Sequence, residues 1–149
     1  MTQLNLLTNK SFLWLSIFFG VLIWSGIEPK DRLTWVLEAG PAMIGLLVMA
    51  KTRISFPLTP LLYVWILLHC IVLMVGAKYT YAEVPLFNSI SEAFGWERNN
   101  YDKVGHFMQG FVPALLAREI LVRKQIVNFA GWRNFIILSI CLAFSAFYE

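Results

Sequence analysis

Five apolar runs alternate with short polar segments along the chain, and each is close to the length of a membrane-spanning helix. A helix needs roughly 20 apolar residues to cross a bilayer, with a range of about 17–25. The runs cover residues 12–27, 33–50, 58–77, 104 to about 122, and 135–149. This pattern predicts an all-α, polytopic transmembrane helix bundle with five visible spans, forming a single integral membrane domain over residues 1–149.

The two ends of the chain carry different signals. The first run follows Lys10 and has no small-residue cleavage site after it, so we expect a retained span and not a removed signal peptide. The fifth run reaches Glu149 with no basic anchor, glycine or proline behind it. We therefore expect the fifth span to be truncated and the natural protein to continue.

Composition agrees with a membrane protein. The 149 residues are 58% hydrophobic and 14% charged, and the mean hydropathy is +0.65. Soluble domains are nearer to about 45–50% apolar and about 25% charged. The net charge of +3 comes without a basic cluster interleaved with aromatics, so the lipid bilayer is the expected partner and nucleic acid is not. Cys70 and Cys141 each lie inside an apolar run and outside any CxxC motif, which is typical of buried free thiols.

Charge predicts the orientation. One set of loops and span ends carries seven basic residues against Glu119 alone, a balance of +6, whereas the other carries five basic and six acidic residues. The basic set is Lys10, Lys51, Arg53, Arg118, Arg123, Lys124 and Arg133. Because basic loops stay cytoplasmic, the N-terminus should be cytoplasmic and the loop over residues 78–103 should face outward. We expect Arg118 and Glu119 to form a charge pair at headgroup level.

The outward loop has a predicted helix of its own. The segment SISE, from Ser89 to Glu92, fits a capping box at a helix start, and Gly95 fits a helix end. The apolar side of this helix is expected to lie on the membrane surface. That side consists of Phe87, Ile90 and Phe94.

Polar residues recur on one side of the fourth span. Asp102, His106, Gln109 and Pro113 follow one another at helical spacing. The opposite side carries Phe107, Phe111 and Leu115. The polar side should contact other helices, and the aromatic side should face lipid.

The predicted topology brings ionisable groups from three spans to one level. Glu38, Asp102, His106 and Glu149 all fall near the outward ends of their spans. Ionisable groups inside a membrane are costly and commonly mark function. His69, in the third span, should lie roughly 12 Å below the outward end by helical rise, deeper than this cluster.

Several kinds of chemistry suit these residue types. A neutral imidazole and two carboxylates form a plausible divalent-metal site, with His106, Glu38 and Glu149 as ligands. The same groups suit catalysis by a general acid and base, with Asp102 orienting the ring of His106. Helix packing without chemistry, and passage of protons or ions, remain open as alternatives. The sequence leaves open whether the protein is an enzyme, and a divalent metal is the cofactor that it suggests.

The residues of the fourth span also resemble a known family. The run ERNNYDKVGHFMQGFVPALLAREIL, residues 97–121, together with the final LAFSAFYE, strongly resembles the YjdF family of bacterial inner-membrane proteins. The shorter pattern DKxxHF, from Asp102 to Phe107, is similar to a signature of VanZ-like membrane proteins. The resemblance implies a multi-spanning inner-membrane protein without an established reaction, and a sequence that continues beyond the final Phe-Tyr-Glu.

Three functions follow as hypotheses. The leading one is a polar or metal site near the outer leaflet that acts on an envelope or lipid-linked substrate. A structural or partner-binding membrane protein is the second. A proton-coupled transporter is the third, and it would need polar groups in the cytoplasmic half, toward which only His69 leads.

Overall fold

The computed structural model describes the backbone of residues 2–148 and the side chains of residues 9–146. Over this part the chain is all-α, with six helices and no strands, as predicted. The helices are α1 (Thr2–Gly26), α2 (Arg32–Thr52), α3 (Pro60–Tyr79), α4 (Pro85–Phe94), α5 (Tyr101–Arg123) and α6 (Ala130–Tyr148).

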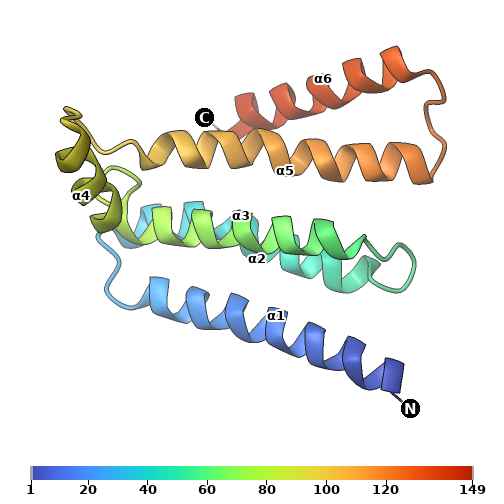
Figure 1. Ribbon diagram of the computed structural model, residues 1–149, viewed down its shortest axis with the longest axis horizontal. Helices are drawn as coiled ribbons and strands as arrows, with labels where there is room; N and C mark the ends of the chain where they lie inside the picture. Colours follow the sequence, from blue (N-terminus) through green and yellow to red (C-terminus); the bar gives the residue numbers. More distant parts are fainter. Residues whose placement is uncertain (1, 149) are drawn as a thin grey trace.

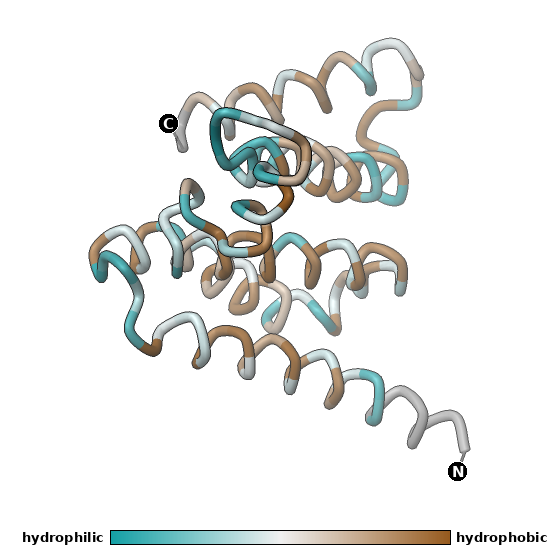
Figure 2. Tube along the Cα trace, turned by 60° about the vertical axis from the view of Figure 1, so that its left-hand side comes forward, coloured by the Kyte–Doolittle hydropathy of each residue, from teal (hydrophilic) through white to brown (hydrophobic). Residues whose placement is uncertain are grey.

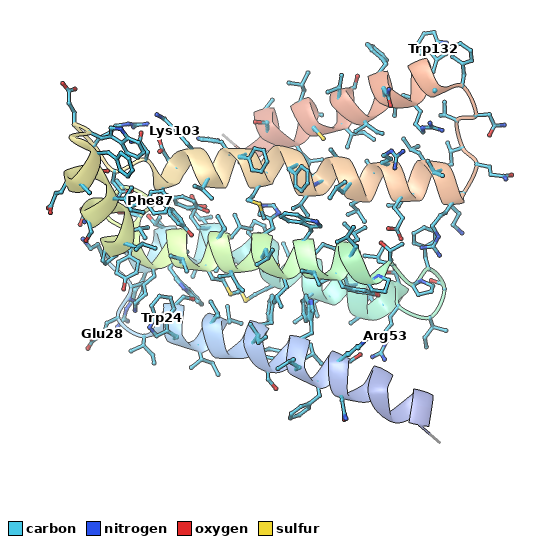
Figure 3. All side chains as sticks on the ribbon, viewed as in Figure 1. Trp24, Glu28, Arg53, Phe87, Lys103 and Trp132 are labelled. Carbon is cyan, nitrogen blue, oxygen red and sulfur yellow. The ribbon has the colours of Figure 1, made fainter. Side chains whose placement is uncertain are left out.

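Five long helices lie side by side, and the short α4 covers one end of them (Figure 1). The helix α3 packs against α1, α2 and α5, whereas α6 packs against α5. We call the end that carries α4 the α4 end. The opposite end, which carries the loops over residues 53–59 and 124–129, we call the basic end. Lys103 and Phe87 lie at the α4 end, and Arg53 and Trp132 lie at the basic end (Figure 3).

Two helices meet the requirements of a membrane span by length and composition. These are α2 and α3, which match the predicted runs 33–50 and 58–77 closely. In α6, the apolar stretch within the described side chains is Ala130–Ala146, which is shorter than the membrane-spanning length of α2 and α3. Hydrophobic residues follow the long helices, and hydrophilic residues gather at turns and helix ends (Figure 2).

Other boundaries differ from the predicted ones. α1 begins at Thr2 and not at Phe12, and α6 begins at Ala130 and not at Phe135. Helix formation depends on backbone hydrogen bonding, which polar residues near a span also support. An apolar run therefore shows which part of a helix is suited to lipid, but it does not show at which residue the helix begins.

The helix α4 exists, but the predicted capping box is wrong. Val84 is the N-cap, Pro85 occupies the first turn, and the Ser89 hydroxyl donates to the Pro85 carbonyl inside the helix at 3.4 Å. Proline suits the first turn because its missing N–H would have no partner there. Gly95 ends the helix at a φ of +65°, as predicted. Phe87 packs edge-on against Tyr101, with ring centroids 5.1 Å apart, so it faces the bundle and not the membrane surface.

The largest core joins α1, α2 and α3. Phe18 and Met74 are fully buried there, beside the small residues Ala39 and Ala42 of α2. Small residues let helix backbones approach closely, which increases the van der Waals contact between the helices. Such contact is important in a membrane, because lipid leaves no hydrophobic driving force for helix association. Trp14 Nε1 donates to the Tyr63 carbonyl at 2.8 Å, which fixes α1 parallel to α3.

A tyrosine ring fills the contact between α3 and α5 near the α4 end. Tyr81 follows α3 with a left-handed φ of 57°. Its ring lies against both Gly76 of α3 and Gly105 of α5, where a Cβ atom on Gly105 would meet Tyr81 Cε1 at 2.8 Å. The two glycines therefore leave room that the ring occupies. The hydroxyl of Tyr101 donates to the Val72 carbonyl at 3.1 Å and joins the same two helices.

A carboxylate ties the loop before α3 to α5 at the basic end. Glu119 accepts from the Thr59 backbone N–H at 2.9 Å, from the Thr59 hydroxyl at 2.7 Å and from Arg123 at 2.7 Å. Arg123 also donates to the Pro57 carbonyl at 2.6 Å and lies over the Phe56 ring. The predicted pairing of Glu119 with Arg118 is therefore wrong. Residues four apart lie on the same helix face, whereas adjacent residues do not.

The start of α2 gives a prediction about pH. Asp31 accepts from the Thr34 backbone N–H at 2.6 Å, and this hydrogen bond holds the pKa of the carboxyl below its ordinary value of 3.8. A lowered pKa adds stability that is present above the unfolded-state pKa and is lost as pH falls through the folded-state value. Asparagine also caps helices but does not titrate there. We therefore expect Asp31→Asn to weaken the loss of thermal stability below about pH 4 in detergent. An unchanged acid profile would contradict this role.

Candidate functional site

A hollow of about 650 Å³ opens where α4 leads into α5. Trp96 provides an aromatic wall, while Arg98 and Lys103 bring two positive charges. Glu97 contributes one negative charge to the same lining. The lining therefore combines charged groups of both signs with an aromatic face.

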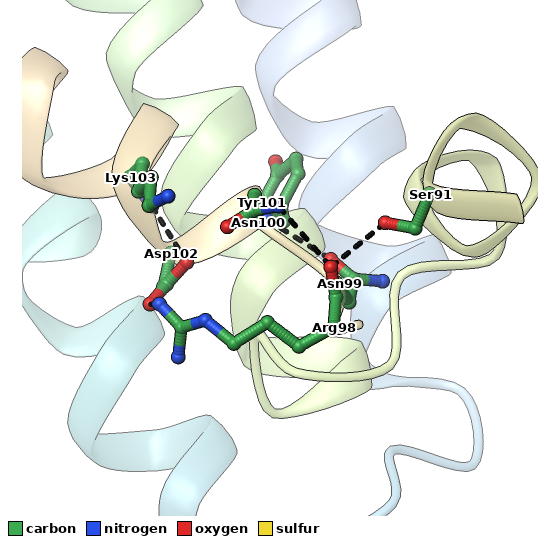
Figure 4. Close-up of polar contacts among 7 residues, drawn as sticks. All are labelled: Ser91, Arg98, Asn99, Asn100, Tyr101, Asp102 and Lys103. Carbon is green, nitrogen blue, oxygen red and sulfur yellow. Dashed lines mark hydrogen bonds and ion pairs between the residues drawn. The ribbon is translucent and has the colours of Figure 1, made fainter. Parts of the chain in front are cut away.

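Hydrogen bonds hold the loop that forms this hollow. The Ser91 hydroxyl donates to the Arg98 carbonyl at 2.9 Å (Figure 4). Asn99 Nδ2 donates to the Val84 carbonyl at 2.9 Å, and Asn99 Oδ1 accepts from the Tyr101 N–H at 3.0 Å. These bonds link the end of α4, the loop and the start of α5. The two cations are thus carried on a fixed backbone.

Asp102 lies beside the hollow and is paired with Arg98. Its Oδ2 atom lies 2.7 Å from the Arg98 guanidinium, and its Oδ1 atom accepts from the Lys103 N–H at 2.9 Å (Figure 4). Such exposed pairs contribute only about 0.3–0.5 kcal/mol. The carboxylate therefore joins the Arg98 side chain to the backbone at the start of α5. Its role in orienting His106 stays a prediction.

His106 lies one turn farther along α5, on an exposed part of the helix. The side of α5 that faces α3 is instead formed by buried residues beginning with Tyr101 and Gly105 and continuing through Met108 and Val112. Phe107 is 62% exposed and so stays available to face lipid, as predicted for the aromatic side. The prediction is wrong for Phe111, whose ring packs edge-on against Trp65 of α3 at 4.9 Å.

His69 lies nearer to the level of His106 than the sequence predicts. The contacts of Tyr101 with Val72 and of Trp65 with Phe111 set an antiparallel register between α3 and α5. This register places His69 opposite the first two turns of α5. Its Nε2 atom is buried without a hydrogen-bond partner among the described residues.

The remaining predicted site residues come from different helices. Glu38 is half-buried on α2 and takes part in an interaction within the protein. α2 packs against α3, and among the described residues it makes no comparably extensive contact with α5. Glu149 lies outside the described residues. The Cys141 thiol lies 3.6 Å from the Gly110 carbonyl. The helix α6 runs back along α5 in the opposite direction (Figure 1).

A metal site of three or more His, Cys, Asp or Glu side chains is absent from the described part of the chain. The predicted ligand set of His106, Glu38 and Glu149 includes a residue beyond that part, so it stays a prediction. Sequence reasoning missed the contribution of Trp96 and Arg98 to the hollow. Arg98 stands four residues before Asp102, the spacing of a helical ion pair, and this was the available signal.

Comparisons with known proteins agree with these observations. Residues 11–149 match the family described as "Predicted membrane protein (DUF2238)". The chain is 48% identical over 144 residues to "Inner membrane protein YjdF" of Escherichia coli (strain K12), an alignment that covers 97% of this chain and 68% of the relative. No solved structure is similar to it. The similarity to VanZ-like proteins stays a prediction, whereas the resemblance to YjdF is confirmed: the chain belongs to this family of membrane proteins and is an inner-membrane protein of the YjdF type.

Proposed function

We propose that the chain forms a single domain of five membrane spans, with its N-terminus in the cytoplasm. The five long helices lie side by side, which supports a common direction across the bilayer (Figure 1). The loops at the basic end carry Arg53, Lys124 and neighbouring cations, which favours a cytoplasmic position for that end. The α4 end then faces outward.

We further propose that the hollow at the α4 end binds the polar part of an envelope or lipid-linked substrate. The observation that carries this proposal is the lining itself, where Arg98 and Lys103 stand beside Trp96. Lys103 is in no ion pair among the described residues, and its ammonium group favours an anionic group such as a phosphate. An aromatic face favours a ring stacked on it. The location at a membrane surface suits a substrate whose apolar part remains in the lipid.

His106 is the group that we propose acts on this substrate. It lies one turn beyond the Asp102–Arg98 pair, and the two nitrogens of an imidazole can donate and accept protons. In the alternative form of the proposal, His106 binds a divalent metal together with Glu38 and Glu149. Glu149 lies outside the described residues, and the position of α2 against α3 gives little support for Glu38.

Metal content separates the two roles of His106. The full-length protein is purified in detergent as wild type, His106→Ala and His69→Ala, and divalent metals are measured by mass spectrometry. If His106 is a ligand, we expect about one ion per chain in wild type and in His69→Ala, and loss of that ion in His106→Ala. The second histidine is the matched control, since the same atoms are removed from another helix.

The opposite result also has a clear meaning. Equal metal content in all three folded proteins contradicts the metal site and leaves proton transfer as the role of His106. In that case Arg98→Gln and Lys103→Gln should weaken binding of the envelope substrate more than His106→Ala does. Unaltered binding in all of these variants would contradict the proposed site itself.

A further inference from the structure

A second cavity, far from the α4 end, lies between α3 and α5 at the basic end. Its volume is about 330 Å³. Its walls are mainly apolar, and its polar lining comes from α5 and from the loop before α3. The residues that matter below are Trp65, Leu115, Val122, Arg118, Glu119 and Arg123.

The charges of this cavity do not balance. Glu119 is the one carboxylate in the lining, and its oxygens are taken by Thr59 and Arg123. Arg118 is exposed and has no ion-pair or hydrogen-bond partner among the described residues. One guanidinium is therefore available to a ligand. Guanidinium groups bind phosphate oxygens through two parallel hydrogen bonds.

The position of the cavity along the helices indicates that the ligand also has an apolar part. Arg118 stands about 8 Å before the end of α5 by helical rise, which is near the headgroup level of a span. Trp65 and Leu115 line the same space toward the middle of the helices. Leu61, in the same lining, is an apolar side chain that is 68% exposed, so the cavity is continuous with an exposed apolar surface. A ligand here needs an anionic head and an apolar chain.

We propose that this cavity binds an anionic phospholipid, with its phosphate on Arg118 and part of an acyl chain against Trp65 and Leu115. Basic pockets between transmembrane helices are suited to such headgroups. The proposal is independent of the substrate site at the α4 end, since the two cavities share no residue.

Native mass spectrometry of the full-length protein tests this site. The detergent-solubilised protein is mixed with phosphatidylglycerol or with phosphatidylcholine of the same acyl chains. Because one basic residue near the membrane surface contributes about fivefold in affinity for an anionic lipid, wild type should retain phosphatidylglycerol about fivefold better. In Arg118→Gln the two lipids should be retained about equally.

Two further variants keep the test specific. Arg53→Gln makes the same change of charge at the same end but outside the cavity (Figure 3), and it should keep the preference of wild type. Leu115→Trp should fill the cavity and reduce retention of both lipids. An equal loss of preference in Arg53→Gln and Arg118→Gln would show general attraction and overturn the proposal. Unchanged retention in Leu115→Trp, or equal retention of both lipids by wild type, would overturn it as well.

Discussion

Replacing Gly76 by alanine is expected to destabilise the protein by about 1–3 kcal/mol, the usual result of overfilling a packed contact. A Cβ atom at Gly76 would overlap the ring of Tyr81. The Tyr81 ring has little room to move away from Gly76, because it also lies against Gly105 of α5. Relief of the overlap therefore requires α3 and α5 to move apart. Thermal unfolding in detergent measures the change.

Gly110→Ala is the matched control for this substitution. Gly110 also lies inside a long helix, but nothing stands within 4 Å of the position that its Cβ would take. Alanine is favoured over glycine in a helix by about 1 kcal/mol, so Gly110→Ala should leave stability unchanged or raise it. In the double variant Gly76→Ala with Tyr81→Ala, the two effects should not add, because the residues are in contact. Additive losses would contradict the proposed packing of the ring.

Substitution of Glu119 by glutamine should destabilise the basic end by about 1 kcal/mol, the usual net contribution of an intramolecular hydrogen bond. The side chain of Glu119 is only 10% exposed and accepts three hydrogen bonds. The amide of glutamine has one accepting oxygen, and its NH₂ group would face the donors of Thr59 or Arg123. The expected result is a lower unfolding temperature together with faster proteolysis of the loop over residues 53–59.

Glu92→Gln provides the comparison for this prediction. Glu92 is exposed on α4, and its substitution removes the same charge. Exposed positions of this kind usually change stability by less than about 0.5 kcal/mol. If Glu119→Gln were no more destabilising than Glu92→Gln, the bonds to Thr59 and Arg123 would not contribute to stability.

The helices were more predictable than their contacts. The apolar runs 33–50 and 58–77 correspond closely to α2 and α3 because polar residues lie near both ends of each run. Asp31 and Arg53 cap α2, and Thr59 and Thr80 cap α3. The end of α4 was located correctly from Gly95, but its start was predicted at Ser89 from the SISE pattern, whereas the helix begins at Pro85. Hydropathy does not choose between them. The observed start is the one at which proline costs no backbone hydrogen bond.

The candidate site was harder to predict, since it depends on how neighbouring helices are aligned. Counting helical rise from the span ends placed His69 below His106. The two spans are offset along their axes, and contacts such as Tyr101 with Val72 set that offset. Likewise, the sequence pattern gave no indication that Tyr81 fills the space beside two glycines. Long-range packing of this kind follows from side-chain shape, which periodicity does not contain.

The central place of α3 has a consequence for the order of assembly during synthesis. α1 and α2 leave the ribosome before α3, yet the core that buries Phe18 and Ala42 also needs Cys70, Leu73 and Met74 of α3. In the proposed five-span topology, the first two helices therefore stay in the membrane without this partner, and lipid covers their apolar surfaces until α3 is inserted. α5 can then join through α3, and α6 through α5. A chain interrupted before α3 would leave two inserted helices without their common partner.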